Sequence, residues 1–113
     1  MTITWHHEPM VRPPLGFDEC RRAAFSLAVR RRREQRGLSR GYVAELAGLT
    51  VLDVIDIEDG ARVPTIDILF TLADALRTDA AELLHETRAL AEELLVERID
   101  RRRGSRVRRR GWR

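Results

Sequence analysis

The chain contains a single cysteine, no lysine and no run of about 18 apolar residues. The lone cysteine, Cys20, cannot close an internal disulfide, and such sparse usage is typical of a reducing compartment. Without a long apolar run we expect no membrane-spanning helix, and the opening residues "MTITWHHEPM" lack the basic-then-apolar order of a signal peptide. From these absences we predict that the protein is located in the cytoplasm. Its 113 residues are enough for one small domain with a modest core.

Side chains suited to metal binding or catalysis are few and scattered. His6 and His7 are adjacent, His85 stands alone, and Cys20 lies apart from all three. Zinc sites usually repeat their ligands at CxxC or HxxxH spacing, which the chain lacks. No Ser–His–Asp or Cys–His arrangement and no glycine-rich phosphate loop can be assigned. We therefore expect no enzyme, no metal ion and no cofactor.

The positive charge is concentrated at one end of the chain. Eight arginines and no acid lie in the last 13 residues, whereas residues 1–100 hold 13 arginines against 18 acids. An acidic body repels phosphate, so the basic end, with Trp112 available for stacking, is predicted to contact nucleic acid. The alternative is that this segment folds against the acidic body of its own chain or of a dimer mate.

Apolar spacing and capping residues predict five helices. The first has Asp18 as its N-cap and runs to about Arg36, and the fifth runs from about Asp79 to Ile99. Ser39, Thr50 and Thr65 are the predicted N-caps of the helices between them. The predicted inward positions, in chain order, are Phe25, Ala28, Val29, Arg32, Val43, Leu46, Ala47, Val54, Ile57, Ile68, Leu69, Leu72, Ala73, Leu76, Leu83, Leu84, Leu90, Ala91, Leu94, Leu95 and Ile99.

The helices and the glycine turn between the second and third resemble the lambda-repressor-like (XRE, Cro-type) helix-turn-helix family. The resemblance runs from about Val29 to Leu84 and rests on "LAVRRRREQRGLS", on Ala47-Gly48-Leu49, and on the closing "AAELL". It implies an all-α domain of five helices with an extended C-terminal helix. In this family an Arg late in helix 1 pairs with a Glu late in helix 3, which implies an ion pair between Arg33 and Glu58.

Composition and helix pattern divide the chain into four predicted segments. These are an extended N-terminal arm (1–17), the helix-turn-helix domain (18–84), an extension of the C-terminal helix (85–100) and a disordered Arg-rich tail (101–113). A fifth helix of about 20 residues spans roughly 30 Å, more than so small a domain can cover. Its extension either folds back on the core or forms the seam of a homodimer.

The resemblance implies which residues contact DNA. Phosphates would be contacted by Ser39, Arg40 and Thr50, and base edges by Val51, Leu52, Ile55 and Asp56. To these we add five arginines as predicted DNA contacts, namely Arg62, Arg106, Arg108, Arg109 and Arg110.

The outward face of the third helix is unusual for a DNA reader. Base edges are read chiefly by Arg, Lys, Asn and Gln, whereas this helix carries an aliphatic trio of Val51, Leu52 and Ile55 among three aspartates. At roughly 4 Å and an effective dielectric near 20, each aspartate–phosphate contact would cost about 4 kcal/mol before screening. An apolar patch with a charged rim suits a protein partner. The alternatives are cover by the chain itself and contact with thymine methyl groups.

Two functions fit these patterns. The first is a DNA-binding transcriptional regulator that acts as a dimer and uses the third helix and the Arg-rich tail. The second is a protein-binding helix-turn-helix module, antitoxin-like or an anti-activator, whose aliphatic trio contacts a partner protein. The family resemblance and the basic tail favour the regulator, and we predict that function.

Overall fold

The computed structural model describes the backbone of residues 17–109 and the side chains of residues 18–103. Over this part of the chain there are five helices and no strand, which confirms the predicted all-α class. The helices are α1 (Phe17–Gln35), α2 (Arg40–Ala47), α3 (Val51–Glu58), α4 (Ile66–Ala75) and α5 (Ala80–Arg109). None of them combines the length and the apolarity needed to cross a membrane. The predicted arm at residues 1–16 lies outside the described residues.

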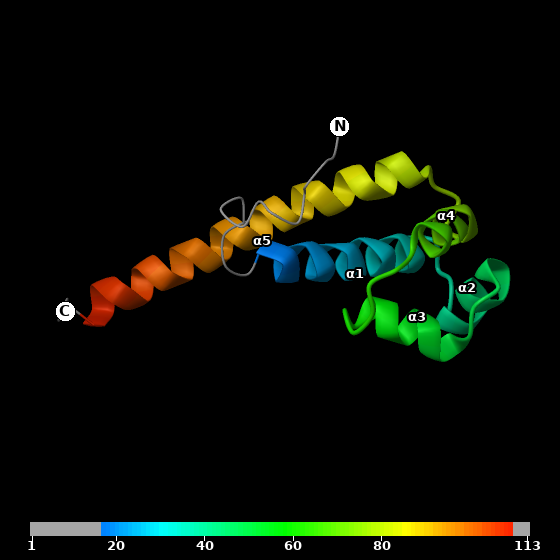
Figure 1. The fold of residues 1–113 in the computed structure, drawn as a ribbon, viewed down its shortest axis with the longest axis horizontal. Coiled ribbons are helices and arrows are strands. Elements are labelled where there is room, and N and C mark those ends of the chain that lie inside the picture. Colours follow the sequence, from blue (N-terminus) through cyan, green and yellow to red (C-terminus); the bar gives the residue numbers. More distant parts are fainter. Residues whose placement is uncertain (1–16, 110–113) are drawn as a thin grey trace, which may run out of the picture.

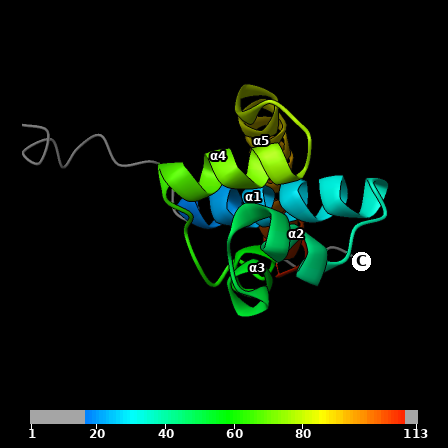
Figure 2. The same ribbon diagram turned by 90° about the vertical axis from the view of Figure 1, so that its right-hand side faces the viewer.

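Helices α1 and α5 form an antiparallel pair that carries the rest of the domain (Figure 1). The other three helices gather around the C-terminal end of α1, and α2 and α3 lie on the opposite side of α1 from α5 (Figures 1 and 2). The α2–α3 unit therefore faces solvent on the side of the molecule that α5 leaves open.

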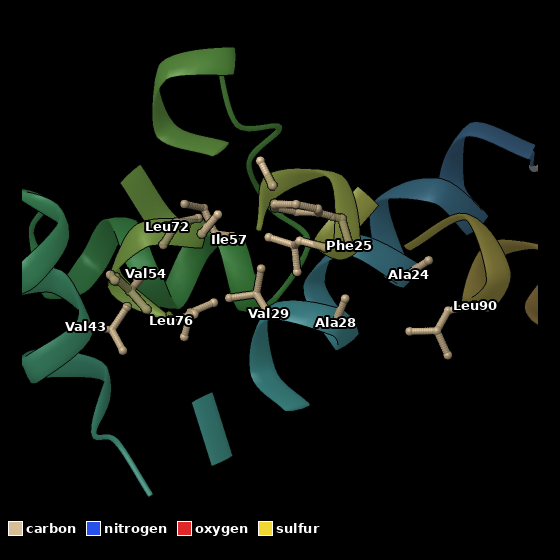
Figure 3. Close-up of a cluster of buried hydrophobic side chains, with 14 of the residues drawn as sticks. Ala24, Phe25, Ala28, Val29, Val43, Val54, Ile57, Leu72, Leu76 and Leu90 are labelled. Carbon is tan, nitrogen blue, oxygen red and sulfur yellow. The ribbon is translucent and has the colours of Figure 1, made fainter. Parts of the chain in front are cut away.

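The core is built by side chains from all five helices (Figure 3). Val29, Val43, Val54 and Ile57 are fully buried, so the inward positions predicted for α1, α2 and α3 are confirmed for these apolar residues. Large buried aliphatic side chains each contribute about 1.5–3 kcal/mol relative to exposure, which makes this cluster the main source of stability. Further members come from α4 and α5, namely Leu72, Leu76, Leu83 and Leu90.

Several predicted details of packing and capping are wrong. Leu46 is 51% exposed, because α2 turns Val43 and Ala44 inward instead. Leu84 and Ile99 are likewise exposed. Helix α1 begins at Phe17, so Asp18 lies in the first turn, where its charge favours the helix N-terminus, rather than at the cap. The predicted caps Ser39, Thr50 and Thr65 are confirmed, each accepting a hydrogen bond from a backbone N–H of the following turn.

Helix α5 is longer than its apolar pattern predicts. It continues to Arg109, so residues 101–109 are helical and not disordered; Arg110 lies outside the described residues. Arginine is a good helix former, and extending an existing helix avoids the cost of nucleation. The Arg98 guanidinium donates to Glu19 in the first turn of α1 at 3.1 Å, which places that residue beside the start of α1. We call residues 99–109, which continue α5 beyond this contact, the overhang.

Of the two predicted alternatives for the fifth helix, folding back on the core is confirmed for its first half, and the homodimer seam stays a prediction. Leu83, Leu90 and Ala91 are buried, and Leu94 packs against the core, so the first half of α5 folds back on the domain. Arg32 reaches the same helix and donates to Glu86 at 3.0 Å. Beyond Arg98 the described residues of α5 are exposed, and Arg101 and Arg102 line a hollow with the start of α1.

Candidate nucleic-acid interface

The turn between α2 and α3 is set by glycine. Gly48 adopts a left-handed conformation with φ of 69°, which L side chains rarely tolerate. A Cβ at this position would meet nothing within 4 Å, so the need for glycine is conformational rather than steric. The backbone N–H of Gly48 donates to Glu45, and that of Leu49 donates to Ala44, which closes α2. Thr50 then caps α3 two residues later.

Glu58 holds three helices together at the end of α3. Its side chain has no exposed surface, and it accepts two hydrogen bonds from Arg33 of α1, at 2.6 and 3.0 Å. Arg40, the first residue of α2, donates to the same carboxylate at 3.0 Å. Arg33 also donates to the backbone carbonyl of Leu38 between α1 and α2. The pair implied by the resemblance is thus present, and a third residue joins it to fix α2 against α3.

The arginines decide the ionisation of Glu58. Burial acts to raise the pKa of this carboxyl, but hydrogen bonds from Arg33 and then Arg40 outweigh it, so the pKa lies below its ordinary value. The same hydrogen bond raises the pKa of Arg33. Both partners are therefore charged at neutral pH, and the buried acid adds no net negative charge to the face.

Acid is expected to weaken the domain through this pair. Because the pKa of Glu58 is lower in the folded chain than its ordinary value of 4.5, its contribution to stability is complete above that pH and is lost as the pH falls through the folded-state value. Urea unfolding below about pH 4.5 should therefore show a steeper loss of stability in the native chain than in Glu58→Gln. Parallel curves for the two proteins would contradict this.

The start of α3 carries a second charge-neutralising contact. Thr50 and Asp53 form a capping box, in which each side chain accepts a hydrogen bond from the other's backbone N–H at 3.1 Å. Arg62 donates to Asp53 at 2.6 Å. Hydrogen bonds from Thr50, with the nearby Arg62, lower the pKa of Asp53, so it stays ionised beside its cation. This places Arg62, a predicted DNA contact, at the N-terminus of α3.

The aliphatic trio lies on the open face of the motif. Leu52 is 70% exposed and Val51 is 46% exposed, while Ile55 is half-buried. Val51 lies close to α2, where its Cγ2 is 3.9 Å from the position a Cβ on Gly41 would take. Cover by the described part of the chain, α5 included, is therefore wrong for Val51 and Leu52; the predicted N-terminal arm lies outside the described residues.

The remaining predicted contacts surround this face. Ser39 is exposed at the start of α2, and the side chain of Arg40 is 36% exposed beside Glu58. Asp56 is also exposed, and no partner for it is found among the described residues. Of the aspartates on α3, Asp53 is thus offset by a cation. The expected repulsion of phosphate therefore comes from Asp56 and from Asp59, which is exposed at the C-cap of the same helix.

The basic end of the chain lies away from this face. Arg101, Arg102 and Arg103 are exposed on the overhang. The backbones of Arg106, Arg108 and Arg109 continue the helix, and their side chains lie outside the described residues. In Figure 1 the overhang and α3 occupy opposite ends of the molecule. The two predicted groups of DNA contacts therefore form separate surfaces and do not share one docking site.

A second exposed apolar surface was missed by the sequence analysis. Val63, Ile66, Phe70 and Leu84 are each about half exposed or more, and a hollow of about 230 Å³ lies among three of them. Ile66 and Phe70 are four residues apart, outside the inward stripe of α4, and this spacing was the available signal. We call these four residues the α4 patch. Among the described residues no group of three metal-ligating side chains is found, and Cys20 is a buried free thiol.

Comparisons with known proteins agree with this geometry. The helix-turn-helix domain family model matches residues 15–85, more than half of the chain. The restriction-modification controller protein C.AhdI from Aeromonas hydrophila is 33% identical, with a TM-score of 0.53 over 54% of this chain and 92% of that one. A search of the curated proteins found no match.

Two crystal structures of the clp gene regulator ClgR from Corynebacterium glutamicum are also similar. Both are 23% identical, with TM-scores of 0.65 and 0.58 over 72% and 61% of this chain, and 87% and 90% of theirs. At this identity they support the lambda-repressor-like fold alone. By their titles, ClgR is a gene regulator and C.AhdI is a restriction-modification controller protein. With the family model covering its core and a glycine turn setting α2 against α3, the chain belongs to the helix-turn-helix domain family.

Proposed function

We propose that this helix-turn-helix transcriptional regulator binds duplex DNA as a homodimer, and that it does so in the cytoplasm. The observation that carries the proposal is the uncovered α2–α3 face, where Leu52 is 70% exposed. Around it stand Ser39, Arg40, Thr50 and Arg62, whose hydroxyl and guanidinium groups are donors suited to phosphate oxygens. C.AhdI, described as a restriction-modification controller protein, supports the same role.

The ion pairs reduce the electrostatic objection to this role. Glu58 is matched by two arginines and Asp53 by Arg62, so these carboxylates do not face a phosphate uncompensated. Phosphate oxygens attract the same guanidinium groups, and Arg40 and Arg62 keep more than a third of their side-chain surface exposed. The α2–α3 face is therefore less repulsive to the phosphates of a duplex than the composition of α3 alone indicates.

Sequence readout by this face is expected to be weak. Val51, Leu52 and Ile55 can contact thymine methyl groups but cannot form hydrogen bonds with base edges. Asp56 can accept a hydrogen bond from the amino group of cytosine. Affinity would then depend on phosphate contacts, with the arginines of the overhang adding to them as a separate cationic surface.

The alternative function is a protein-binding module, antitoxin-like or an anti-activator. It is favoured by the exposure of Val51 and Leu52, since large exposed aliphatic groups beside acids are typical of protein contacts. In that case α3 would be covered by a partner protein and the overhang alone would contact nucleic acid.

Leu52→Arg separates the two functions. If α3 faces phosphates, the new guanidinium should raise affinity for duplex DNA by about five- to tenfold at low salt and steepen the salt dependence by about 0.9. Gel shifts with random and genomic duplexes at several salt concentrations measure both. Leu84→Arg makes the same change at an exposed position of α5 and serves as the control. Equal gains in the two variants, or a loss in Leu52→Arg, would point to the protein-binding function.

A further inference from the structure

One face of α5 carries an ordered row of exposed residues, the first of which, Glu92, also lines a hollow with Arg21 of α1. Val96 and Ile99 are 56% and 42% exposed, although both are large and apolar. Glu92 precedes Val96 by four residues and Arg103 follows Ile99 by four, and both are exposed. Spacings of four, three and four residues keep all four side chains on one face of a helix. We call them the α5 row.

Two copies of the α5 row match each other when their helices run antiparallel, because apolar residues then face apolar residues and acids face arginines. In an antiparallel pair centred between Val96 and Ile99, each Val96 meets the Ile99 of the other copy. The equal four-residue offsets then bring each Glu92 beside an Arg103. A parallel pair would instead place like charges together, Glu92 beside Glu92 and Arg103 beside Arg103, which is unfavourable.

The charges along the whole of α5 follow the same order as the row, with acids first and arginines last. Residues 80–100 of α5 carry six acids and two arginines, whereas residues 101–109 carry six arginines and no acid. In an antiparallel pair, the basic overhang of each copy lies beside the acidic part of α5 in the other copy. The dimer therefore contains this contact twice. Such a contact, in which the same surface of both copies is used, is the arrangement of a closed two-fold dimer.

We propose that two copies of this chain associate through antiparallel α5 helices centred on Val96 and Ile99, with Glu92 of each copy beside Arg103 of the other. This inference deepens the homodimer of the proposed function, and its test needs no DNA. Within one chain Glu92 contacts Arg88 at 3.6 Å, with both side chains more than half exposed. Because an exposed pair of this kind is weak, Glu92 can still contact Arg103 of a second copy.

The pairing also sets how far apart the motif-bearing ends of the two α5 helices lie. Ala80 is about 17 residues from the centre of the row, or roughly 26 Å at 1.5 Å per residue. The ends of the two α5 helices that carry the motifs would therefore lie roughly 50 Å apart. This exceeds the approximately 34 Å of one helical turn of DNA, so the half-sites of one dimer would be more widely spaced than one turn.

Charge reversal at the row tests the seam. Sedimentation equilibrium of the native chain over a concentration series should show a reversible shift from 13.1 kDa to twice that mass. Glu92→Arg and Arg103→Glu should each weaken association by about tenfold, because each change is repeated at two pairs of a symmetric dimer. Combining them restores opposite charges at both pairs and should recover the native association. Glu45→Arg on α2 is the control, and circular dichroism checks that each variant keeps its helices.

Three results would overturn the proposal. The first is a chain that stays at 13.1 kDa throughout the series, and the second is a double variant that associates no better than the single ones. The third is a dimer that survives Val96→Asp but is lost in Ile66→Asp, which would assign the seam to the α4 patch. A chain that stays monomeric yet shifts duplex DNA would remove this seam and leave DNA binding standing.

Discussion

Glu58→Ala is expected to lower the free energy of unfolding by about 3 kcal/mol, near the lower end of what breaking a buried ion pair costs. The substitution leaves Arg33, whose side chain is 12% exposed, without the carboxylate that accepts two of its hydrogen bonds. Arg40 loses its only carboxylate contact among the described residues. Because Arg40 is 36% exposed and recovers some hydration, the loss stays below the largest values known for such pairs.

Urea unfolding at neutral pH, followed by circular dichroism, measures this loss. Glu45→Ala removes an exposed carboxylate from α2 and should change stability by less than about 0.5 kcal/mol. Glu58→Gln keeps the shape of the side chain and should fall between the two. Equal free energies of unfolding for Glu58→Ala and Glu45→Ala would show that Glu58 does not hold α2 against α3.

Features set by neighbouring residues were the most predictable from the sequence. The caps at Ser39, Thr50 and Thr65 and the turn at Gly48 depend on hydrogen bonds and backbone angles within a few residues, and all are present. The ion pair of Arg33 and Glu58 was implied by the family resemblance. Nothing in their spacing alone would have paired two residues 25 positions apart.

Features that depend on tertiary packing were less predictable. An α2 of only eight residues gives too short a pattern to tell whether Leu46 or Ala44 turns inward. The pairing of Asp53 with Arg62 requires the loop after α3 to fold back on its first turn, which no local pattern indicates. For residues 101–109, composition favoured disorder, but an existing helix in front of them favours continuation.

A chain cut after Asp100 is expected to lose most of its affinity for duplex DNA at low salt, because it lacks eight of the 21 arginines. Each phosphate contact contributes about 0.9 to the slope of log affinity against log salt. If half of the removed arginines contact phosphates, the slope should fall by roughly 3 to 4, with at least a hundredfold weaker binding near 50 mM salt. Gel shifts across a salt series measure both quantities.

Arg101→Gln with Arg102→Gln is the matched control for the cut. It removes two exposed charges, keeps α5 and leaves Arg103 of the α5 row in place. Its slope should fall by about 2 if both residues contact phosphate. An unchanged slope in the cut chain would show that α2 and α3 supply all the phosphate contacts. If the native chain shows no sequence preference and Glu92→Arg, which weakens the α5 seam without removing an arginine, still binds, complete loss of binding in the cut chain would mean that only the basic end touches DNA. The α3 helix would then serve a partner protein.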